Sequence, residues 1–442
     1  MSILWVWMNG ERVATWTVTR GVHTLEYEQA WIESPRRRPL SLSLPFTADR
    51  TIKGDKVSSY FENLLPDDDR IRERVRGRFK AASIGAIDLL TAIGRDCVGA
   101  IQLMPPERPP EGFDRVEYEA LDDTQVERHL ILATMPQLAG AGDLDEDSWR
   151  ISIAGAQEKT ALLKIGDQWC RPQGATPTTH IMKLPLGLVA NQQADMTHSV
   201  QNEWLCLNLL QELGLPAANS EILTFGSKTV LAVERFDREW SKTKAGTDWI
   251  IRLPQEDLCQ ALGLPPTQKY EHTDGKGRTT GPTMQSVMQV LSASAEASKD
   301  VATFLLAQMC FWILGNTDAH GKNFSIFLKS GDVYAMTPLY DVISLWPIAG
   351  DGPNQMKQKV MKLAIPLRAR RTLRKLDDIG VEDWIVAANQ AGIKDLAGQM
   401  FALAASVPDA VERLSKRLPA GFPQPIWDKV TSRVLERAKT FR

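Results

Sequence analysis

The stretch Asn316-Thr317-Asp318-Ala319-His320-Gly321-Lys322-Asn323 decides how this chain of 442 residues is interpreted. An Asp and an Asn separated by four residues have the spacing of a protein-kinase catalytic loop. Tyr340-Asp341 follows where a second magnesium ligand would be expected. Phosphoryl transfer needs such a set because negative charge spreads over oxygens that positioned cations must neutralise. About one accidental match to this spacing is expected in a chain of this length, so other motifs must support it.

Three further segments are relevant to the same chemistry. Ser152-Ile153-Ala154-Gly155-Ala156-Gln157-Glu158-Lys159 combines small residues, whose backbone N–H groups can cradle phosphates, with strand-like flanks. Lys183 lies in the apolar strand His180–Leu184, where its ammonium could reach a nucleotide's phosphates. Glu234-Arg235-Phe236 follows a strand and could form a hinge against an adenine. Taken alone, the first segment favours a hairpin turn and Lys183 favours an edge-strand or snorkelling lysine, while the third segment is equally well a strand end.

Their order strengthens the kinase interpretation. The chain carries the elements of a kinase in the order that a kinase requires: a glycine turn, a strand lysine, a hinge, an Asp-x4-Asn loop and a later Asp. We therefore predict Asp318 as the general base and Asn323 and Asp341 as magnesium ligands. His320 and Lys322 are predicted to line the phosphate or ribose side.

The same segments resemble the HipA family of bacterial toxin kinases. The resemblance rests on Ser152-Ile-Ala-Gly-Ala-Gln-Glu-Lys-Thr-Ala161, Glu234-Arg-Phe-Asp-Arg238, Gly315 to Ser325 and Tyr340-Asp-Val-Ile-Ser344. Phe61-Glu-Asn-Leu-Leu-Pro-Asp67 is similar to the N-terminal signature of that family. The likeness extends over residues 1 to 440.

The resemblance implies an ATP- and Mg²⁺-dependent serine/threonine-protein kinase, the toxin of a type II toxin–antitoxin system that causes growth arrest and persistence. It implies phosphorylation of glutamyl-tRNA synthetase, a HipB-like helix-turn-helix antitoxin as partner, and corepression of the operon with that antitoxin, with operator DNA bound mainly through the complex. Ser152 is the implied autophosphorylation site that switches the enzyme off. The added negative charge would repel ATP phosphates. The implied ATP-binding residues are Ala154, Gly155, Ala156, Gln157, Glu158, Lys159, Lys183, Glu234, Arg235, Phe236, His320, Gly321, Lys322, Asn323, Tyr340 and Asp341.

Composition sets limits on the class of protein. The net charge of −2 excludes a global basic excess, so any nucleic-acid contact must use a local patch or a partner. The five cysteines never form a Cys-x-x-Cys pair, so neither a disulfide framework nor a zinc site is indicated and a reducing cytoplasm is expected. The longest apolar run, Phe304 to Leu314, is too short for a membrane span and reads as a buried helix. We expect a soluble protein without membrane contact.

The pattern fits an α+β, kinase-like bilobal fold, and the resemblance implies that this fold is of the PI3/4-kinase-like type. A strand-rich N-terminal subdomain is expected over residues 1–110, ending at the linker Pro105–Pro110. The N-lobe, with phosphate loop, strand lysine and hinge, would cover 111–240, and a mostly helical C-lobe 241–442. Other predicted segments are a hairpin at 4–18 around Asn9-Gly10 and strands at 40–44, 179–184 and 229–233, together with helices at 70–80, 201–213, 381–391, 395–405, 409–418 and 426–439 and loops at 241–247 and 271–282.

Two alternatives to an active toxin kinase remain. A small-molecule or lipid kinase of related fold would use the same Asp, Asn and Asp. A non-catalytic corepressor would bind antitoxin and DNA only, although intact Lys183, Asp318, Asn323 and Asp341 argue against it. The basic stretch Lys357–Lys375, with eight Lys or Arg and no acid, could contact DNA phosphates or simply be a solvated face.

Overall fold

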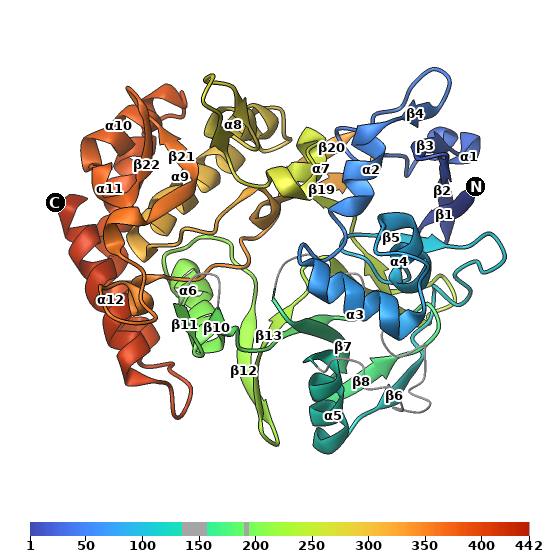
Figure 1. Ribbon diagram of the computed structural model, residues 1–442, viewed down its shortest axis with the longest axis horizontal. Coiled ribbons are helices and arrows are strands. Elements are labelled where there is room, and N and C mark those ends of the chain that lie inside the picture. The colour runs from blue at the N-terminus through green and yellow to red at the C-terminus, as the bar shows by residue number, and fades with distance from the viewer. Residues whose placement is uncertain (135–156, 190–193, 442) are drawn as a thin grey trace.

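The computed structural model describes residues 1–134, 157–189 and 194–441 of the chain. Strand-rich segments from the N-terminal half lie on one side of the molecule, and the helices α10, α11 and α12 lie on the other (Figure 1). Ser152 and Ala154 to Ala156 fall outside the described residues.

The N-terminal part is built on a five-stranded sheet of order β4-β3-β2-β1-β5. The predicted hairpin is confirmed, because β1 and β2 pair antiparallel and the turn between them has positive φ at Asn9 (46°) and Gly10 (82°). Trp16 and Phe61 stack in the core of this part with ring centroids 3.8 Å apart. Its elements are β1 Ser2–Met8, β2 Glu11–Thr19, β3 Val22–Tyr27, α1 Gln29–Glu33, β4 Thr51–Lys53, α2 Asp55–Glu62, α3 Asp69–Phe79, α4 Ala86–Ile93 and β5 Ile101–Met104.

The strand predicted at residues 40–44 is wrong. This stretch is a turn closed by a bridge between Ser41 and Leu44. The Ser41 hydroxyl lies 2.8 Å from that of Ser43, and both donate to the Gln260 carbonyl oxygen. Side-chain hydrogen bonds of this kind compete with a strand ladder, and periodicity alone does not reveal them.

A second sheet of six strands, in the order β12-β13-β9-β7-β8-β6, carries the predicted phosphate lysine on its central strand β9. The predicted strands at 179–184 and 229–233 are confirmed as β9 and β13, which pair antiparallel. The elements of this region are β6 Tyr118–Ala120, α5 Asp123–Thr134, β7 Lys159–Ile165, β8 Gln168–Pro172, β9 His180–Lys183, β10 Gly187–Val189, β11 Ala194–Met196, α6 Ser199–Glu212, β12 Ser220–Phe225 and β13 Lys228–Glu234.

Along the chain, the part that carries the predicted catalytic loop comes between the six-stranded sheet and the C-terminal helices. The loop predicted at 241–247 is the turn of a β-hairpin, and the one at 271–282 contains a two-residue strand pair. The elements are β14 Arg238–Lys242, β15 Asp248–Arg252, β16 Gln255–Asp257, α7 Leu258–Leu262, β17 His272–Thr273, β18 Thr279–Thr280, α8 Met284–Ser292, α9 Ala297–Leu314, β19 Ser325–Lys329 and β20 Val333–Met336.

The C-terminal region departs from the prediction in two places. Helices predicted at 395–405 and 409–418 are one helix, α11, with Pro408 inside it. The basic stretch Lys357–Lys375 lies in the region predicted to be mostly helical, but it contains a β-hairpin of β21 and β22, with Ala369–Arg371 at its turn. The elements are β21 Lys362–Arg368, β22 Thr372–Lys375, α10 Val381–Gln390, α11 Leu396–Ser415 and α12 Gln424–Ala438.

Helix α9 is the central helix of the largest hydrophobic core. Phe304, Ala307 and Met309 on it are fully buried. Among the described residues, it is the one helix whose length and composition would allow a membrane crossing, but 78% of the tested window is buried in protein. The core explains its apolar character.

A buried ion network joins the N-terminal part to the strand ends of the rest of the chain. The Asp96 carboxylate accepts from Arg235 at 3.2 Å and Arg238 at 2.9 Å, and lies 3.4 Å from Arg252. Asp237 pairs with Arg235 at 3.0 Å and accepts from the Gly99 backbone N–H at 2.7 Å. Desolvation alone would raise the pKa of Asp96, but the three guanidinium groups hold it well below its usual range.

Candidate active site

The predicted catalytic loop begins where α9 ends. Gly315 closes the helix in the left-handed conformation (φ 65°) and Asn316 follows, fully buried. The Asn316 side-chain oxygen accepts from the backbone N–H of Asp318 at 2.9 Å. The helix core therefore fixes the position of the loop.

Asn323 and Asp341 lie side by side at the end of this loop. The Asn323 amide N–H donates to the backbone oxygens of Asp318 (2.8 Å) and Asp341 (3.5 Å). This orientation leaves the Asn323 side-chain oxygen as a ligand atom. Asp341 has a positive φ of 57°, an uncommon conformation that aims its carboxylate back toward the six-stranded sheet. The antiparallel hairpin of β19 and β20 separates the loop from Asp341 along the chain.

Lys183 connects the sheet to both sides of the site. Its ammonium donates to Glu203 on α6 at 2.5 Å and to Asp341 at 2.8 Å. The Lys183 and Glu203 side chains are 8% and 4% exposed, so the pair is buried, whereas the Asp341 side chain is 40% exposed. Desolvation opposes the charge on Lys183, but Asp341 and Glu203 outweigh it and raise its pKa.

Lys159 on β7 lies directly opposite Lys183 in the antiparallel ladder. Desolvation lowers the pKa of Lys159 to about 8, while the Asp341 carboxylate partly offsets this effect. Desolvation would also raise the pKa of Asp341, yet Lys183 and Lys159 hold it well below its usual range. Two lysines and one ionised carboxylate thus share one site.

Asp318 accepts a short hydrogen bond from the Tyr270 hydroxyl. Both side chains are open to solvent, with Tyr270 42% exposed, although protein atoms crowd the surroundings of Asp318. This desolvation raises the pKa of Asp318 to about 6, against the lowering effect of the Tyr270 hydrogen bond and with a further rise from Asp341. A carboxylate with such a pKa is suited to accept a proton near neutral pH.

The predicted role of Lys322 does not fit its contacts. Its ammonium is buried and donates to Asp67 at 2.9 Å and to the Asn63 carbonyl oxygen at 3.1 Å. Asp67 also accepts from Lys269 at 2.7 Å. The side chain of Lys322 therefore binds the N-terminal signature segment instead of facing a nucleotide, because a buried ammonium requires a local counter-charge.

Three other predicted nucleotide contacts have competing partners. Glu158 pairs with Arg74 on α3 at 2.5 Å, and an acidic side chain would in any case repel phosphates. The Gly321 N–H donates to the Lys269 carbonyl oxygen at 3.0 Å. The Gln157 amide donates to the Leu184 carbonyl oxygen at 2.6 Å, which ties the end of the predicted phosphate loop to β9.

His320 is buried beside the base. Its ring meets that of Tyr270 edge-on with centroids 5.0 Å apart. Desolvation, with a contribution from Lys269, lowers the pKa of His320 to about 3, so the ring is neutral. Its place next to Asp318 agrees with a contact role.

The three side chains of the predicted hinge, Glu234 to Phe236, have different surroundings. The Arg235 side chain belongs to the buried ion network, so it is structural and cannot contact an adenine. Glu234 is exposed and its carboxylate accepts from Asn219 at 2.9 Å. The Phe236 ring packs 5.7 Å from that of Tyr340, whose hydroxyl donates to the Lys322 carbonyl oxygen at 2.8 Å. These two rings can form an apolar wall.

Glu203, Tyr270, Lys269 and Asp67 are site residues that the sequence interpretation missed. For Glu203 a signal existed, since it is an acid beside Trp204 and Leu205 on the apolar face of a helix, where charge needs a partner. For Tyr270 and Lys269 no spacing rule applied, because they come from a polar, Gly-containing loop. Asp67 stood inside a recognised motif without an assigned role.

The site offers few protein ligands for a metal ion. Within the described residues, no group of three or more His, Cys, Asp or Glu side chains is placed to hold a metal. A magnesium ion in a kinase needs fewer protein ligands, because water and phosphate oxygens complete its shell. The Asp341 carboxylate and the Asn323 amide oxygen fit that requirement.

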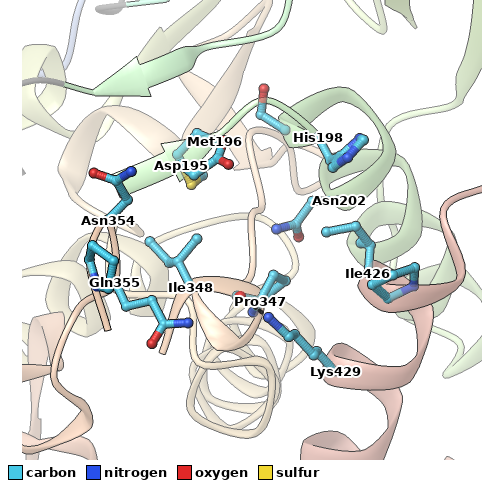
Figure 2. Close-up of a pocket in the computed structure, with 13 residues that line it drawn as sticks. Asp195, Met196, His198, Asn202, Pro347, Ile348, Asn354, Gln355, Ile426 and Lys429 are labelled. Carbon is cyan, nitrogen blue, oxygen red and sulfur yellow. Dashed lines mark hydrogen bonds between the residues drawn. The ribbon is translucent and has the colours of Figure 1, made fainter. Parts of the chain in front are cut away.

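A cavity of about 270 Å³ lies away from these residues (Figure 2). It is lined by Met196, Asn202, Ile348 and Ile426 among others, between β11, the start of α6 and α12. None of the predicted site residues that the structure describes lines it. It is separate from the candidate active site.

Two family models match this chain. The HipA-like C-terminal domain matches residues 151–416, and the HipA N-terminal domain matches residues 4–104. The chain belongs to the HipA family. The putative kinase Y4mE of Sinorhizobium fredii is 32% identical to it over 402 residues, which are 89% of this chain and 86% of that protein.

Two further relatives come from Shewanella oneidensis. The serine/threonine-protein kinase toxin HipA is 29% identical over 338 residues, 74% of this HipA-family chain and 71% of that protein. The solved structure of a toxin–antitoxin complex of HipA, HipB and operator DNA matches with a TM-score of 0.78 at 22% identity, covering 99% of this chain and 96% of that one. The HipA fold therefore extends over the whole chain.

Proposed function

We propose that this HipA-family chain is an ATP- and Mg²⁺-dependent serine/threonine-protein kinase. The observation that carries the proposal is the buried Lys183, paired with Glu203 on a helix and with Asp341 beside the Asp318–Asn323 loop. A strand lysine paired with a helix glutamate, next to a metal-binding Asp, is the arrangement that active protein kinases require. A PI3/4-kinase-like type of fold is part of the same proposal.

Lys183 and Lys159 would hold the nucleotide's phosphates. The Lys183 ammonium pairs with the Asp341 carboxylate at 2.8 Å, and Lys159, opposite Lys183 in the ladder, also lowers the pKa of Asp341. Phe236 and Tyr340 would border the adenine, and backbone groups of Glu234 to Phe236 would bind its edge. Ala154, Gly155 and Ala156, outside the described residues, would supply the backbone cradle.

Asn323 and Asp341 would bind Mg²⁺ through a side-chain amide oxygen and a carboxylate. The ion supplies positive charge that neutralises the transferred phosphoryl group. Asp318 would accept the proton of the attacking serine or threonine hydroxyl, for which its raised pKa is suitable. His320 would contact the bound substrate from beside the base.

We further propose that the chain is the toxin of a HipBA-like system. A HipB-like helix-turn-helix antitoxin would be its partner, and the complex would repress the operon on its DNA. Glutamyl-tRNA synthetase is the proposed substrate, and its phosphorylation would arrest translation and promote persistence. Ser152 is the proposed autophosphorylation site.

The test uses purified full-length chain with labelled ATP and Mg²⁺, with and without glutamyl-tRNA synthetase. We expect phosphate on the synthetase and on Ser152. The variant Asp318→Ala should lose both phosphorylations, and its expression should no longer arrest growth. Phosphate on a small molecule or lipid instead would establish the alternative kinase class. Binding of antitoxin and DNA without ATP binding or autophosphorylation would establish the non-catalytic corepressor.

A further inference from the structure

Three consecutive residues, Lys269-Tyr270-Glu271, connect three parts of the molecule at the catalytic base. Lys269 donates to Asp67 of the N-terminal part at 2.7 Å. Tyr270 donates to Asp318. Glu271 accepts from Arg368 and Arg374 of the β21–β22 hairpin, at 3.0 and 2.9 Å. We refer to these residues as the 269–271 segment.

The segment is held firmly on both sides of Tyr270. The Glu271 side chain is fully buried between its two arginines. The Asp67 carboxylate, 12% exposed, lies between Lys269 and Lys322, and desolvation of this acid is outweighed by the two lysines, which lower its pKa to about 2. Moving Tyr270 away would separate buried charges, which is costly.

The backbone adds two restraints. The Lys269 carbonyl oxygen accepts from the N–H of Gly321 in the catalytic loop at 3.0 Å. Gly281 packs so closely on the Tyr270 carbonyl oxygen that a Cβ there would lie 2.1 Å from it. Tyr270 is thus a fixed part of the site, not a cover that opens.

The contact leaves one oxygen of the base available. Tyr270 binds Oδ1 of Asp318, and within the described part of the chain no hydrogen bond is made by Oδ2. A carboxylate with one oxygen fixed by a hydroxyl donor presents the other in a defined direction. An acceptor hydroxyl must meet that oxygen in line with the phosphoryl group, and small misplacements there are costly in rate.

We propose that Tyr270 is a positioning residue that orients Asp318 for proton acceptance, held in register by Asp67 and by the β21–β22 hairpin. This inference rests on the proposed kinase function. It gives the N-terminal signature and the basic hairpin a shared role in the active site. Arg368 and Arg374 of the basic stretch then hold Glu271, and through it the neighbouring Tyr270, in place.

The test compares Tyr270→Phe with the native full-length chain. Removing an exposed hydroxyl should leave the fold intact, leave the affinity for a non-hydrolysable ATP analogue within twofold, and lower kcat about tenfold or more. Tyr118→Phe, which removes the hydroxyl of another exposed tyrosine on β6, outside the site, is the matched control and should keep native kcat.

Tyr270→Phe should also be non-additive with Glu271→Gln, since both act on the same contact. Unchanged or increased kcat in Tyr270→Phe would overturn the inference, as would a loss of ATP affinity equal to the loss of rate. A native chain without any phosphotransfer would instead remove the proposed function itself, and the inference with it.

Discussion

At the level of single residues, we expect both stability and activity to depend on the pair of Lys183 and Glu203. Their side chains are almost fully buried, so each depends on the other for its charge. Removing one member of a buried pair is more damaging than removing both, because the remaining charge stays desolvated.

We predict that Lys183→Met abolishes phosphotransfer and lowers the free energy of unfolding by about 3 kcal/mol. The double variant with Glu203→Gln should recover at least half of that stability and none of the activity. Urea unfolding and a labelled-ATP assay measure the two effects. Lys299→Met, in an exposed pair with Glu296, is the control and should unfold like the native chain. Equal stability of the single and double variants would contradict the prediction.

Glu256 is another buried ionisable residue. Its Oε1 accepts from the Leu42 N–H at 2.8 Å, while Oε2 is buried without a partner among the described residues. Desolvation raises the pKa of Glu256 to about 8. The folded state therefore keeps a proton that the unfolded state releases, and stability declines as pH rises from the unfolded value near 4.5 toward 8.

Glu256→Gln should remove this decline, since the amide resembles the protonated acid and cannot ionise. We expect the variant to be at least about 1 kcal/mol more stable than the native chain at pH 8, and the difference to shrink toward pH 5. Thermal unfolding across this pH range measures it. A variant that is less stable at pH 8 would show that the carboxylate is ionised and stabilised in the folded state.

At the level of elements, the end of α9 decides where the catalytic loop begins. Gly315 has a φ of 65°, and a Cβ there would lie 2.5 Å from the Trp346 ring. Gly331, at the β19–β20 turn, has a φ of 79° but open space around it. The two glycines share the backbone requirement and differ in packing.

Gly331→Ala should therefore cost about 1 kcal/mol for the left-handed backbone alone. Gly315→Ala should cost about 2 kcal/mol more, because the ring must move, and should also lower kcat by shifting Asn316 and Asp318. Denaturant unfolding and kinase assays of both variants provide the comparison. Equal losses of stability would mean that the Trp346 contact is not important.

At the level of the whole molecule, buried charges join regions that are distant in sequence. Asp96 of the N-terminal part forms ion pairs with Arg235, Arg238 and Arg252. Asp67 of the same part forms ion pairs with Lys269 and with Lys322 of the catalytic loop. Buried ion pairs therefore attach the N-terminal part to the candidate active site.

Asp96→Asn should lower the free energy of unfolding by about 3 kcal/mol or more, because three buried guanidinium groups lose a counter-charge. Urea unfolding of the full chain measures this, with Glu412→Gln in an exposed helix pair as the control. A loss no larger than that of the control would show that Asp237 alone neutralises the network.

The sequence predicted those elements whose pattern is local. The Asn9-Gly10 hairpin, the strands at Lys183 and Val230, and the buried helix before Asn316 are confirmed, because turn residues and hydrophobic periodicity specify them. The turn at 40–44 and the continuous helix through Pro408 were predicted wrongly, because distant side chains and packing overrode the local pattern.

The sequence by itself determined the family resemblance, the order of the kinase motifs and the assignment of Lys183, Asp318, Asn323 and Asp341 as candidates, because these are matters of residue type and spacing. Only the tertiary structure decided which charges meet. It brought Glu203 to Lys183, took Lys322 and Arg235 into structural ion pairs, and placed Tyr270 on Asp318. A buried charge is stabilised by whichever counter-charge the fold brings near, and that proximity is not encoded in spacing along the chain.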